Sequence, residues 1–304
     1  MLNSRPTVRS TLKALLYIAP LLVISLAFTF WPLLEAFAMG FYRHYNFYLN
    51  QIGSLSLANF QFLWHDAAFQ LALRNTLIFI IGVVPVSIGL ALLLALSLHH
   101  ARHFAKLLQT IYFLPLVTSS VAIAIVWRWL FSAEHGGLNG WLAIINRTPV
   151  DWLNDPRYSL LALIIVCIWH SLGLNIILLL ASLQQIDRRY YLAAQLDGAN
   201  SWQQFTNVTW PLLTPMILLV SINAVIVNLK VFDQVYALFN GSAGPANADL
   251  TLMYYLYQKF YVEDQPTIAA ACGIVLFGIT VGLTLGTLWV LRRHHYPQRG
   301  WSPS

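Results

Sequence analysis

The sequence predicts an all-α polytopic membrane protein with six transmembrane helices, and three observations lead to this prediction. The 304 residues are 58% hydrophobic and only 9% charged, whereas a soluble domain carries about a quarter charged residues. The apolar residues gather into six runs that are each long enough to cross a bilayer. Lys and Arg are concentrated at the chain ends and in alternate connections between those runs.

Each apolar run holds about 20 or more residues, and at ~1.5 Å per residue a helix of this length crosses a hydrocarbon core of ~30 Å. The backbone of a lipid-embedded segment must satisfy its own hydrogen bonds, and the alternation of a barrel strand is absent, so we expect helices. The predicted spans are Ala14–Leu34, Thr76–Leu98, Leu107–Phe131, Leu160–Leu183, Leu212–Val235 and Thr267–Leu291.

The charge distribution predicts that both termini are cytoplasmic. The two chain ends and the connections after the second and fourth spans carry ten Lys and Arg against two Asp, a balance of +8. The rest of the chain carries seven cations against nine carboxylates, a balance of −2, and together these give the net charge of +6. Positive loops mark the cytoplasmic side, so the basic excess describes topology and indicates no nucleic-acid partner.

No repeat or low-complexity linker divides the chain. We therefore expect one transmembrane domain over residues 14–291, with cytoplasmic tails at 1–13 and 292–304. The first run is too long for the core of a cleaved signal, and we interpret it as an uncleaved anchor. Cys167 and Cys272 both lie within spans. A redox pair is one interpretation, and small apolar filler is the one we favour.

A polar segment at residues 184–210 interrupts the apolar pattern, and its turn and capping signals predict an ordered structure. Asp187 can cap a short helix over RRYYLAAQL, and Gly198 can supply the left-handed turn that ends this helix. The segment lies on the side that the charges assign to the cytoplasm.

A second short helix is expected after this turn. Ser201 and Gln204 have the spacing of a capping box, and Pro211 is expected to end the helix before the fifth span. Trp202 and Phe205 are expected to anchor the pair of helices against the membrane domain. We call residues 184–210 the elbow.

Small residues on the first elbow helix predict a docking surface. Ala193 and Ala194 present little side-chain bulk, so the backbone of another protein can approach closely. The alternative is a solvated loop that only connects two spans. Capping signals at both ends favour the docking element.

The elbow resembles the cytoplasmic loop of permease subunits of bacterial ATP-binding-cassette importers, whose pattern is roughly E-A-A, three residues, G, nine residues, I-x-L-P. The form DGA, followed by F and P-L-L-x-P, is most similar to the carbohydrate, maltose-type branch. VWRWLF, SLQQI and LKVFDQVYALFNGSAGP extend the resemblance over most of the chain. Leu192 stands where the family has Glu, and Ala243 where it has the first of two Gly. The residues that form the coupling loop by this resemblance are Leu192, Ala193, Ala194, Asp197, Gly198, Ala199, Phe205, Pro211 and Pro215.

The resemblance implies a type I ABC importer permease fold in the bacterial inner membrane. It implies three kinds of partner: a second homologous permease subunit, a dimer of a cytoplasmic ABC ATPase and an extracytoplasmic solute-binding protein. The chain itself has no G-x-x-x-x-G-K-[ST] motif and no catalytic constellation, so it is not expected to be an enzyme or to bind a cofactor. ATP and Mg²⁺ would be used by the ATPase.

Polar residues within the spans are candidates for the solute path, because such groups are costly in lipid. At 100° per residue, Asn223, Lys230 and Asp233 share one face of the predicted fifth helix. Asn175 is the candidate on the fourth helix. Lys230 and Asp233 can instead form a simple ion pair near the outer end, which we rate slightly above a role in binding solute.

Two short groups of histidines raise the question of metal binding. They are His99, His100 and His103 on the inner side, and His294 and His295 near the C-terminus. Solvation beside the membrane is the favoured interpretation, because sequence shows no converging ligands. We expect no metal site.

The predicted function is that of a permease subunit of an ATP-driven importer for a sugar or related polyol, with glycerol phosphate left open. The alternative is a stand-alone secondary transporter or channel, although ion coupling usually places carboxylates in the middle of spans. A third possibility is a membrane scaffold without transport activity, which the ordered elbow disfavours.

Overall fold

The computed structural model describes residues 8–46, 51–100 and 111–294, apart from residues 113, 116 and 135. Its regular structure is helical except for one short antiparallel pair, β1 (Tyr45–Asn46) with β2 (Gln51–Ile52). The chain forms two compact units. One holds the residues up to Asp66 together with Leu256–Ile274, and the other holds Ala67–Tyr255 and the residues from Val275 onward.

The helices differ in length and type. The α-helices are α1 (Val8–Ser25), α2 (Trp31–Met39), α3 (Ala58–His65), α4 (Ala67–His100), α6 (Ser120–Leu130), α7 (Gly137–Ile144), α8 (Ser159–Gln184), α9 (Arg188–Leu196), α10 (Ser201–Gln204), α11 (Trp210–Leu229), α12 (Asp233–Leu238), α13 (Leu252–Tyr257) and α14 (Pro266–His294). The π-helical turns are η1 (Leu26–Phe30), η2 (Phe205–Thr209) and η4 (Gln258–Val262), and η3 (Pro245–Asn247) is a 3₁₀ turn.

The first unit contains a continuous helix built from α1, η1 and α2. Its apolar part, Leu16–Met39, is long enough to span a bilayer, and none of it is buried inside the structure. Small or apolar side chains on such a helix can contact lipid or another membrane helix. The predicted first span is therefore confirmed, with its end five residues later than Leu34.

A buried cation lies in the same unit. The Lys259 side chain in η4 is nearly inaccessible, and its Nζ donates to Glu263 Oε2 at 2.6 Å. Asp66 Oδ2 lies 3.9 Å from the same nitrogen, and the Phe62 ring centroid lies 5.6 Å away. A buried ammonium needs opposite charge around it, so these contacts join the end of α3 to η4.

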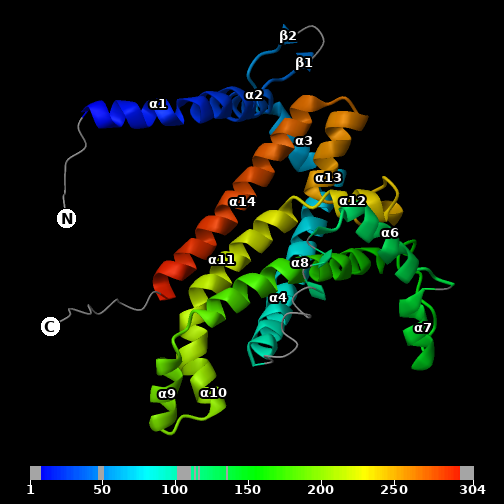
Figure 1. Ribbon diagram of the computed structural model, residues 1–304. Helices are drawn as coiled ribbons and strands as arrows, with labels where there is room; N and C mark the ends of the chain where they lie inside the picture. The colour runs from blue at the N-terminus through cyan, green and yellow to red at the C-terminus, as the bar shows by residue number, and fades with distance from the viewer. Residues whose placement is uncertain are drawn as a thin grey trace. The chain divides into compact units, whose positions relative to one another are not determined.

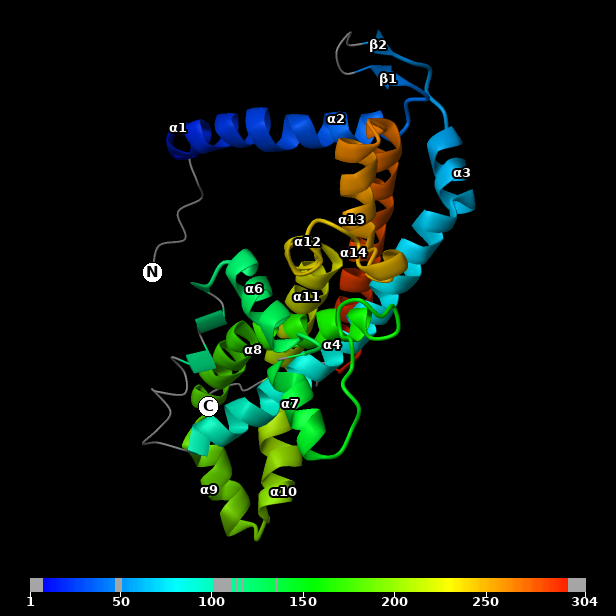
Figure 2. The ribbon, with the colours of Figure 1, turned by 90° about the vertical axis from the view of Figure 1, so that its right-hand side faces the viewer.

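In the second unit, α4, α8 and α11 pack against one another (Figures 1 and 2). Their contact is apolar and fully buried, as expected for interdigitated helices. The core consists of Ala91, Ala95 and Leu98 from α4, Ile176, Leu179, Leu180 and Leu183 from α8, and Leu213 and Val220 from α11. These residues come from the ends of α4 and α8 and the start of α11, so the core lies beside the elbow.

Five helices of the described part of the chain are long and apolar enough to cross a membrane. They are Leu16–Met39, Ala67–His99, Ser159–Gln184, Ser201–Leu229 and Pro266–Trp289. The third predicted span corresponds in part to α6, which is shorter, and its residues 107–110 lie outside the described residues. The count of six therefore stays a prediction.

Two predicted boundaries are wrong. α4 begins at Ala67 rather than Thr76, because AAFQLALRN continues the helix into the segment expected to be an outer loop. The fifth span ends at Leu229 rather than Val235. The carbonyl of Val231 accepts a hydrogen bond from Thr251 Oγ1 at 3.1 Å, and Phe232 leaves the helical conformation with φ −137°.

The connection between α12 and α13 is held against the start of α4. Asn75 Nδ2 donates to the carbonyls of Ala248 at 3.0 Å and Leu250 at 3.2 Å. Thr76 Oγ1 accepts from the Leu252 amide at 2.9 Å. Local turns alone do not fix this connection. Buried side chains of α4 satisfy its backbone groups.

Asp249 lies inside this connection with no partner for its charge. Its side chain is fully buried, and neither carboxylate oxygen accepts a hydrogen bond in the described structure. Burial raises the pKa of the Asp249 carboxyl to about 7, and the nearby Ser159 hydroxyl opposes this shift without completing a hydrogen bond. The carboxylate presses against Gly244, where φ is 75° and an added Cβ would collide with Oδ2.

The Asn75→Ala variant is expected to lose stability. It removes a buried donor and leaves two or more carbonyls unsatisfied, which costs about 1–3 kcal/mol. Thermal unfolding of the purified protein in detergent measures the effect, and Asn207→Ala at an exposed position is the control. Equal unfolding midpoints for the two variants would contradict the role of Asn75 in holding the connection between α12 and α13.

The buried Asp249 carboxyl predicts a pH dependence of stability. Because its folded-state pKa is raised from 3.8 to about 7, the folded protein holds a proton that the unfolded chain releases between those values. The free energy of unfolding should therefore be highest below about pH 4 and decline up to about pH 7. Asp249→Asn should remove this part of the slope, whereas Asp197→Asn at an exposed position should leave it unchanged.

Candidate functional site

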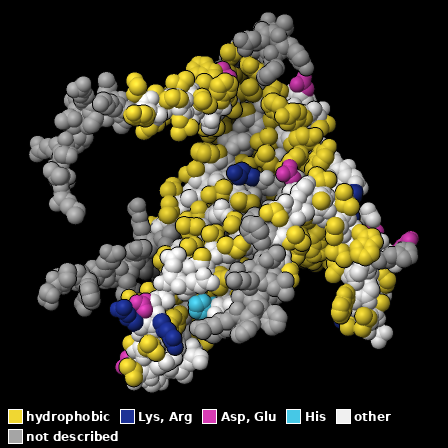
Figure 3. Space-filling model, viewed as in Figure 1, with side chains coloured by type: hydrophobic (Ala, Val, Ile, Leu, Met, Phe, Trp, Pro, Cys, Tyr) yellow, Lys and Arg dark blue, Asp and Glu magenta, His cyan; other side chains and the backbone are white. Residues whose placement is uncertain are grey.

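The elbow is a hairpin of two short helices, α9 and α10, that projects beyond the ends of α8 and α11 (Figures 1 and 2). It follows directly from α8 and runs without interruption into the helix that becomes α11. Figure 3 shows dark blue Lys or Arg side chains on the elbow as well as elsewhere on this face, and much of the visible helical surface is hydrophobic.

Both ends of α9 are closed by the predicted residues. The Asp187 carboxylate accepts from the Arg189 amide at 2.9 Å, which satisfies one orphan donor of the first turn. At the other end, Gly198 adopts φ 78°. The Ala199 amide then donates to the Ala194 carbonyl at 2.9 Å and the Gly198 amide to Gln195 at 3.0 Å. This is the Schellman arrangement, and it requires a left-handed residue.

The cap of α10 lies one residue earlier than predicted. Asn200, not Ser201, is the N-cap, and its Oδ1 accepts from the Gln203 amide at 2.9 Å while Gln203 Oε1 accepts from the Asn200 amide at 2.8 Å. The predicted Ser201–Gln204 box is therefore wrong in register. Asn caps a helix as well as Ser, and the turn after Gly198 leaves Asn200 extended at ψ 172°.

Pro211 does not end the second elbow helix. The chain stays helical from Ser201 to Leu229, with the π-turn η2 just before Trp210-Pro211. A π-turn widens the ladder where a proline ring would otherwise clash with a carbonyl one turn earlier. η1 stands in the same relation to Trp31-Pro32.

Several large apolar side chains are exposed on the elbow, among polar and charged ones. Leu196 is 90% exposed and Trp202 is 70% exposed, and Tyr190 and Leu192 are about half exposed. Ala193 is exposed between them and leaves the backbone accessible. Trp202 was predicted to anchor the elbow inward, and its exposure shows that this prediction is wrong. Phe205 alone of the two faces the helices.

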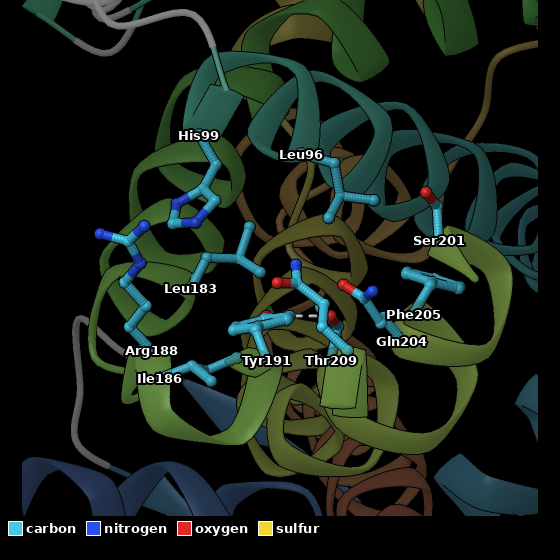
Figure 4. A pocket seen from close by; sticks show the side chains of 11 residues that line it. Leu96, His99, Leu183, Ile186, Arg188, Tyr191, Ser201, Gln204, Phe205 and Thr209 are labelled. Carbon is cyan, nitrogen blue, oxygen red and sulfur yellow. Dashed lines mark hydrogen bonds between the residues drawn. The ribbon is translucent and has the colours of Figure 1, made fainter. Parts of the chain in front are cut away.

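A pocket of ≈ 620 Å³ lies between the elbow and the ends of α4 and α8 (Figure 4). One part of its wall is apolar and the other carries hydroxyl, amide and basic groups. The lining residues are Leu96, His99, Leu183, Ile186, Arg188, Tyr191, Gln195, Ser201, Gln204, Phe205 and Thr209. Tyr191 Oη and Thr209 Oγ1 form a hydrogen bond of 3.0 Å within it. Sequence reasoning missed this pair, because no motif links the two positions.

The candidate solute-path residues differ in burial and in their hydrogen-bond partners. Asn175 on α8 is 2% exposed, and its Nδ2 has no hydrogen-bond partner among the described residues. Asn223 on α11 is half-buried. Asn228 is buried too, but its amide donates to the Ala224 carbonyl at 2.8 Å. Asn175 therefore keeps a spare donor inside a membrane span.

Lys230 and Asp233 do not continue the face of Asn223, because α11 ends at Leu229 and Asp233 begins α12. Both side chains are exposed beyond the end of the span, and the described structure shows no ion pair between them. The prediction of a shared helical face and the alternative of a simple ion pair are both wrong, for the same reason. The helix breaks between the two residues.

The described part of the chain holds no group of three His, Cys, Asp or Glu that could bind a metal ion. His103 and His295, from the two histidine groups, lie outside the described residues. Cys167 and Cys272 are each buried, and their interpretation as small apolar filler stays a prediction.

Comparison with protein families gives a match over residues 87–293 to the binding-protein-dependent transport system inner membrane component. The lactose transport system permease protein LacF of Rhizobium radiobacter is 38% identical over 259 residues, which cover 83% of this chain and 86% of that protein. The arabinooligosaccharides transport system permease protein AraP of Bacillus subtilis is 30% identical over 90% of this chain and 86% of its own length.

The fold has a counterpart among solved structures. A chain in the crystal structure of a bacterial alginate ABC transporter, in complex with an alginate pentasaccharide-bound periplasmic protein, superposes with a TM-score of 0.78 and 25% sequence identity, over 93% of this chain and 96% of that chain. This likeness supports the type I permease fold. It favours a permease subunit of an importer over a stand-alone transporter. The chain thus belongs to the family of binding-protein-dependent transport system inner membrane components, as a multi-pass, non-catalytic permease subunit of the inner membrane.

Proposed function

We propose that this permease moves a neutral sugar or polyol inward and that the elbow docks on a separate ATPase subunit. The observation that carries the proposal is the exposed apolar surface of a rigidly capped hairpin. Leu196 and Trp202 face solvent on an element whose turn is fixed by Gly198 and Asn200. Large exposed apolar groups on an ordered element mark a contact with another protein.

The chemistry of the elbow favours docking through apolar contact. Leu192, at the position of the family's Glu, is 46% exposed, so it can enter an apolar recess of the partner. Asp197 and Gly198 at the tip are exposed as well. The neighbouring surface has little side-chain bulk because it is formed by Ala193, Ala194 and Ala199. The segment that leads into α11 contains Phe205, Pro211 and Pro215.

The energy for transport must come from another chain. No phosphate-binding loop occurs in the sequence, so ATP and Mg²⁺ would be bound by a dimer of the partner ATPase. A second permease subunit would complete the path across lipid, and a solute-binding protein would deliver the solute from outside. The excess of Lys and Arg supports a cytoplasmic position for the elbow, the tail at 1–13 and the tail at 292–304.

A neutral, hydroxyl-rich solute fits the helices best. α8 and α11 contain no Lys or Arg. A solute that carries a phosphate group would need such cations for binding. Asn175 and Asn223 offer amide groups that can donate to and accept from hydroxyls. The relatives named for lactose and arabinooligosaccharides carry uncharged sugars. Because Asn175 is buried here, solute would reach it only in another packing of the helices. Lys230 and Asp233, exposed beyond the span, would meet solute only at its outer end.

Gly198 provides the sharpest test of docking. Gly198→Pro cannot adopt φ 78° and loses the amide that bonds Gln195, so the turn must rearrange. We expect ATP-driven uptake of radiolabelled sugar by the reconstituted complex to fall more than about tenfold. Gly198→Asn is the matched control, since Asn tolerates the left-handed region and the space around this Cα is open. Equal uptake by both variants would contradict docking through the elbow.

The side of the membrane on which the elbow lies can be measured by thiol labelling. In a variant with Cys167 and Cys272 replaced by Ala, Asp151→Cys should react with an impermeant maleimide added to intact spheroplasts. Ser201→Cys should react only after permeabilisation, because the elbow is expected on the cytoplasmic side. Labelling of Ser201→Cys from outside would refute the proposed orientation.

A further inference from the structure

The hydrogen bond between Tyr191 and Thr209 joins the two arms of the elbow far from its turn. Tyr191 belongs to α9, and Thr209 is the last residue of η2, directly before the spanning helix α11. Their hydroxyl oxygens are 3.0 Å apart, and either can donate. Thr209 is 5% exposed and Tyr191 is half-buried, whereas the adjacent Tyr190 is 56% exposed. The chain has therefore turned one of two neighbouring tyrosines inward.

The pocket makes this bond mechanically significant. Figure 4 shows Tyr191 and Thr209 linked at the pocket, with Leu96 of α4 and Leu183 of α8 on the wall beyond them. Close-packed side chains transmit displacement in all directions, but an open volume does not. A pocket of ≈ 620 Å³ separates α9 from the ends of α4 and α8. A direct hydrogen bond therefore matters more for the mechanical connection of α9 to the spanning helices than it would in a close-packed interface.

The other elbow hydrogen bonds are local. Asn200 and Gln203 cap α10, and Gln204 Nε2 bonds the Ala199 carbonyl at 3.0 Å. These contacts fix the turn, but they do not reach from α9 to α11. The Tyr191–Thr209 bond spans 18 residues and ends on a π-turn, a segment whose ladder can change register more easily than an α-helix.

We infer that the Tyr191–Thr209 hydrogen bond is a clasp that makes α9 move as one body with the start of α11. The inference rests on the proposed docking of the elbow on an ATPase. Displacement of α9 by the ATPase then shifts the π-turn and the spanning helix together. Without the clasp, α9 can follow the ATPase while α11 stays behind, so ATP hydrolysis continues without transport. Tyr191 is thus a positioning residue for coupling and not part of the docking surface.

Hydroxyl removal tests the clasp in the assembled transporter. Tyr191→Phe and Thr209→Val should each lower the number of sugar molecules imported per ATP hydrolysed by about fivefold, the factor expected for one neutral hydrogen bond. ATPase copurification and the ATPase rate should stay unchanged. Tyr190→Phe, which removes an exposed hydroxyl from the same helix, and Thr209→Ser, which keeps the hydroxyl, should retain the full ratio. The double variant should be no worse than either single variant.

Two results would overturn the clasp. An unchanged import-to-hydrolysis ratio in Tyr191→Phe shows that the bond transmits nothing. Loss of ATPase copurification in that variant assigns Tyr191 to docking instead. Failure of the unsubstituted protein to copurify with any ATPase is a different outcome, because it removes the docking proposal itself.

Discussion

A chain embedded in hydrocarbon must satisfy its backbone hydrogen bonds within its own helices, and this constraint shapes every part of the structure. It makes long uninterrupted helices such as α4 and α8 the default. Outside the bilayer, water can satisfy the ends of a helix, so caps there serve to order an element. The elbow is ordered in this way by Asp187, Gly198 and Asn200, which hold its exposed apolar side chains in place for contact.

The sequence predicted the parts of the fold that follow from length, hydropathy and local turn chemistry. Apolar runs located both ends of the fourth and sixth spans within two residues, and the spacing of Asp187 and Gly198 predicted both ends of α9. These features depend on residues that are close in the chain. The family of the protein was also accessible, because the motif around Gly198 occurs together with others along most of the chain.

Features that depend on distant residues were not predictable in the same way. The fifth helix ends at Leu229, and Thr251, which is distant in sequence, donates to the Val231 carbonyl just beyond this end. The break separates Asn223 from Asp233. Trp202 and Phe205 are equivalent candidates for anchors in the sequence, yet only Phe205 lines the pocket beside α4 and α8, and Trp202 is exposed. From sequence, Pro211 is expected to end the second elbow helix, whereas the π-turn before it lets the helix continue. Nothing in the sequence around Asp249 indicates that its side chain is buried.

The central claim is that the exposed surface of the elbow contacts an ATPase, and site-specific photocrosslinking measures this contact directly. A photoreactive amino acid at Leu196, which is 90% exposed, is predicted to crosslink to the ATPase in the assembled transporter. The same probe at Tyr261, 72% exposed in a predicted outer segment, should give no such product. Crosslinking from Tyr261 but not from Leu196 would contradict the account.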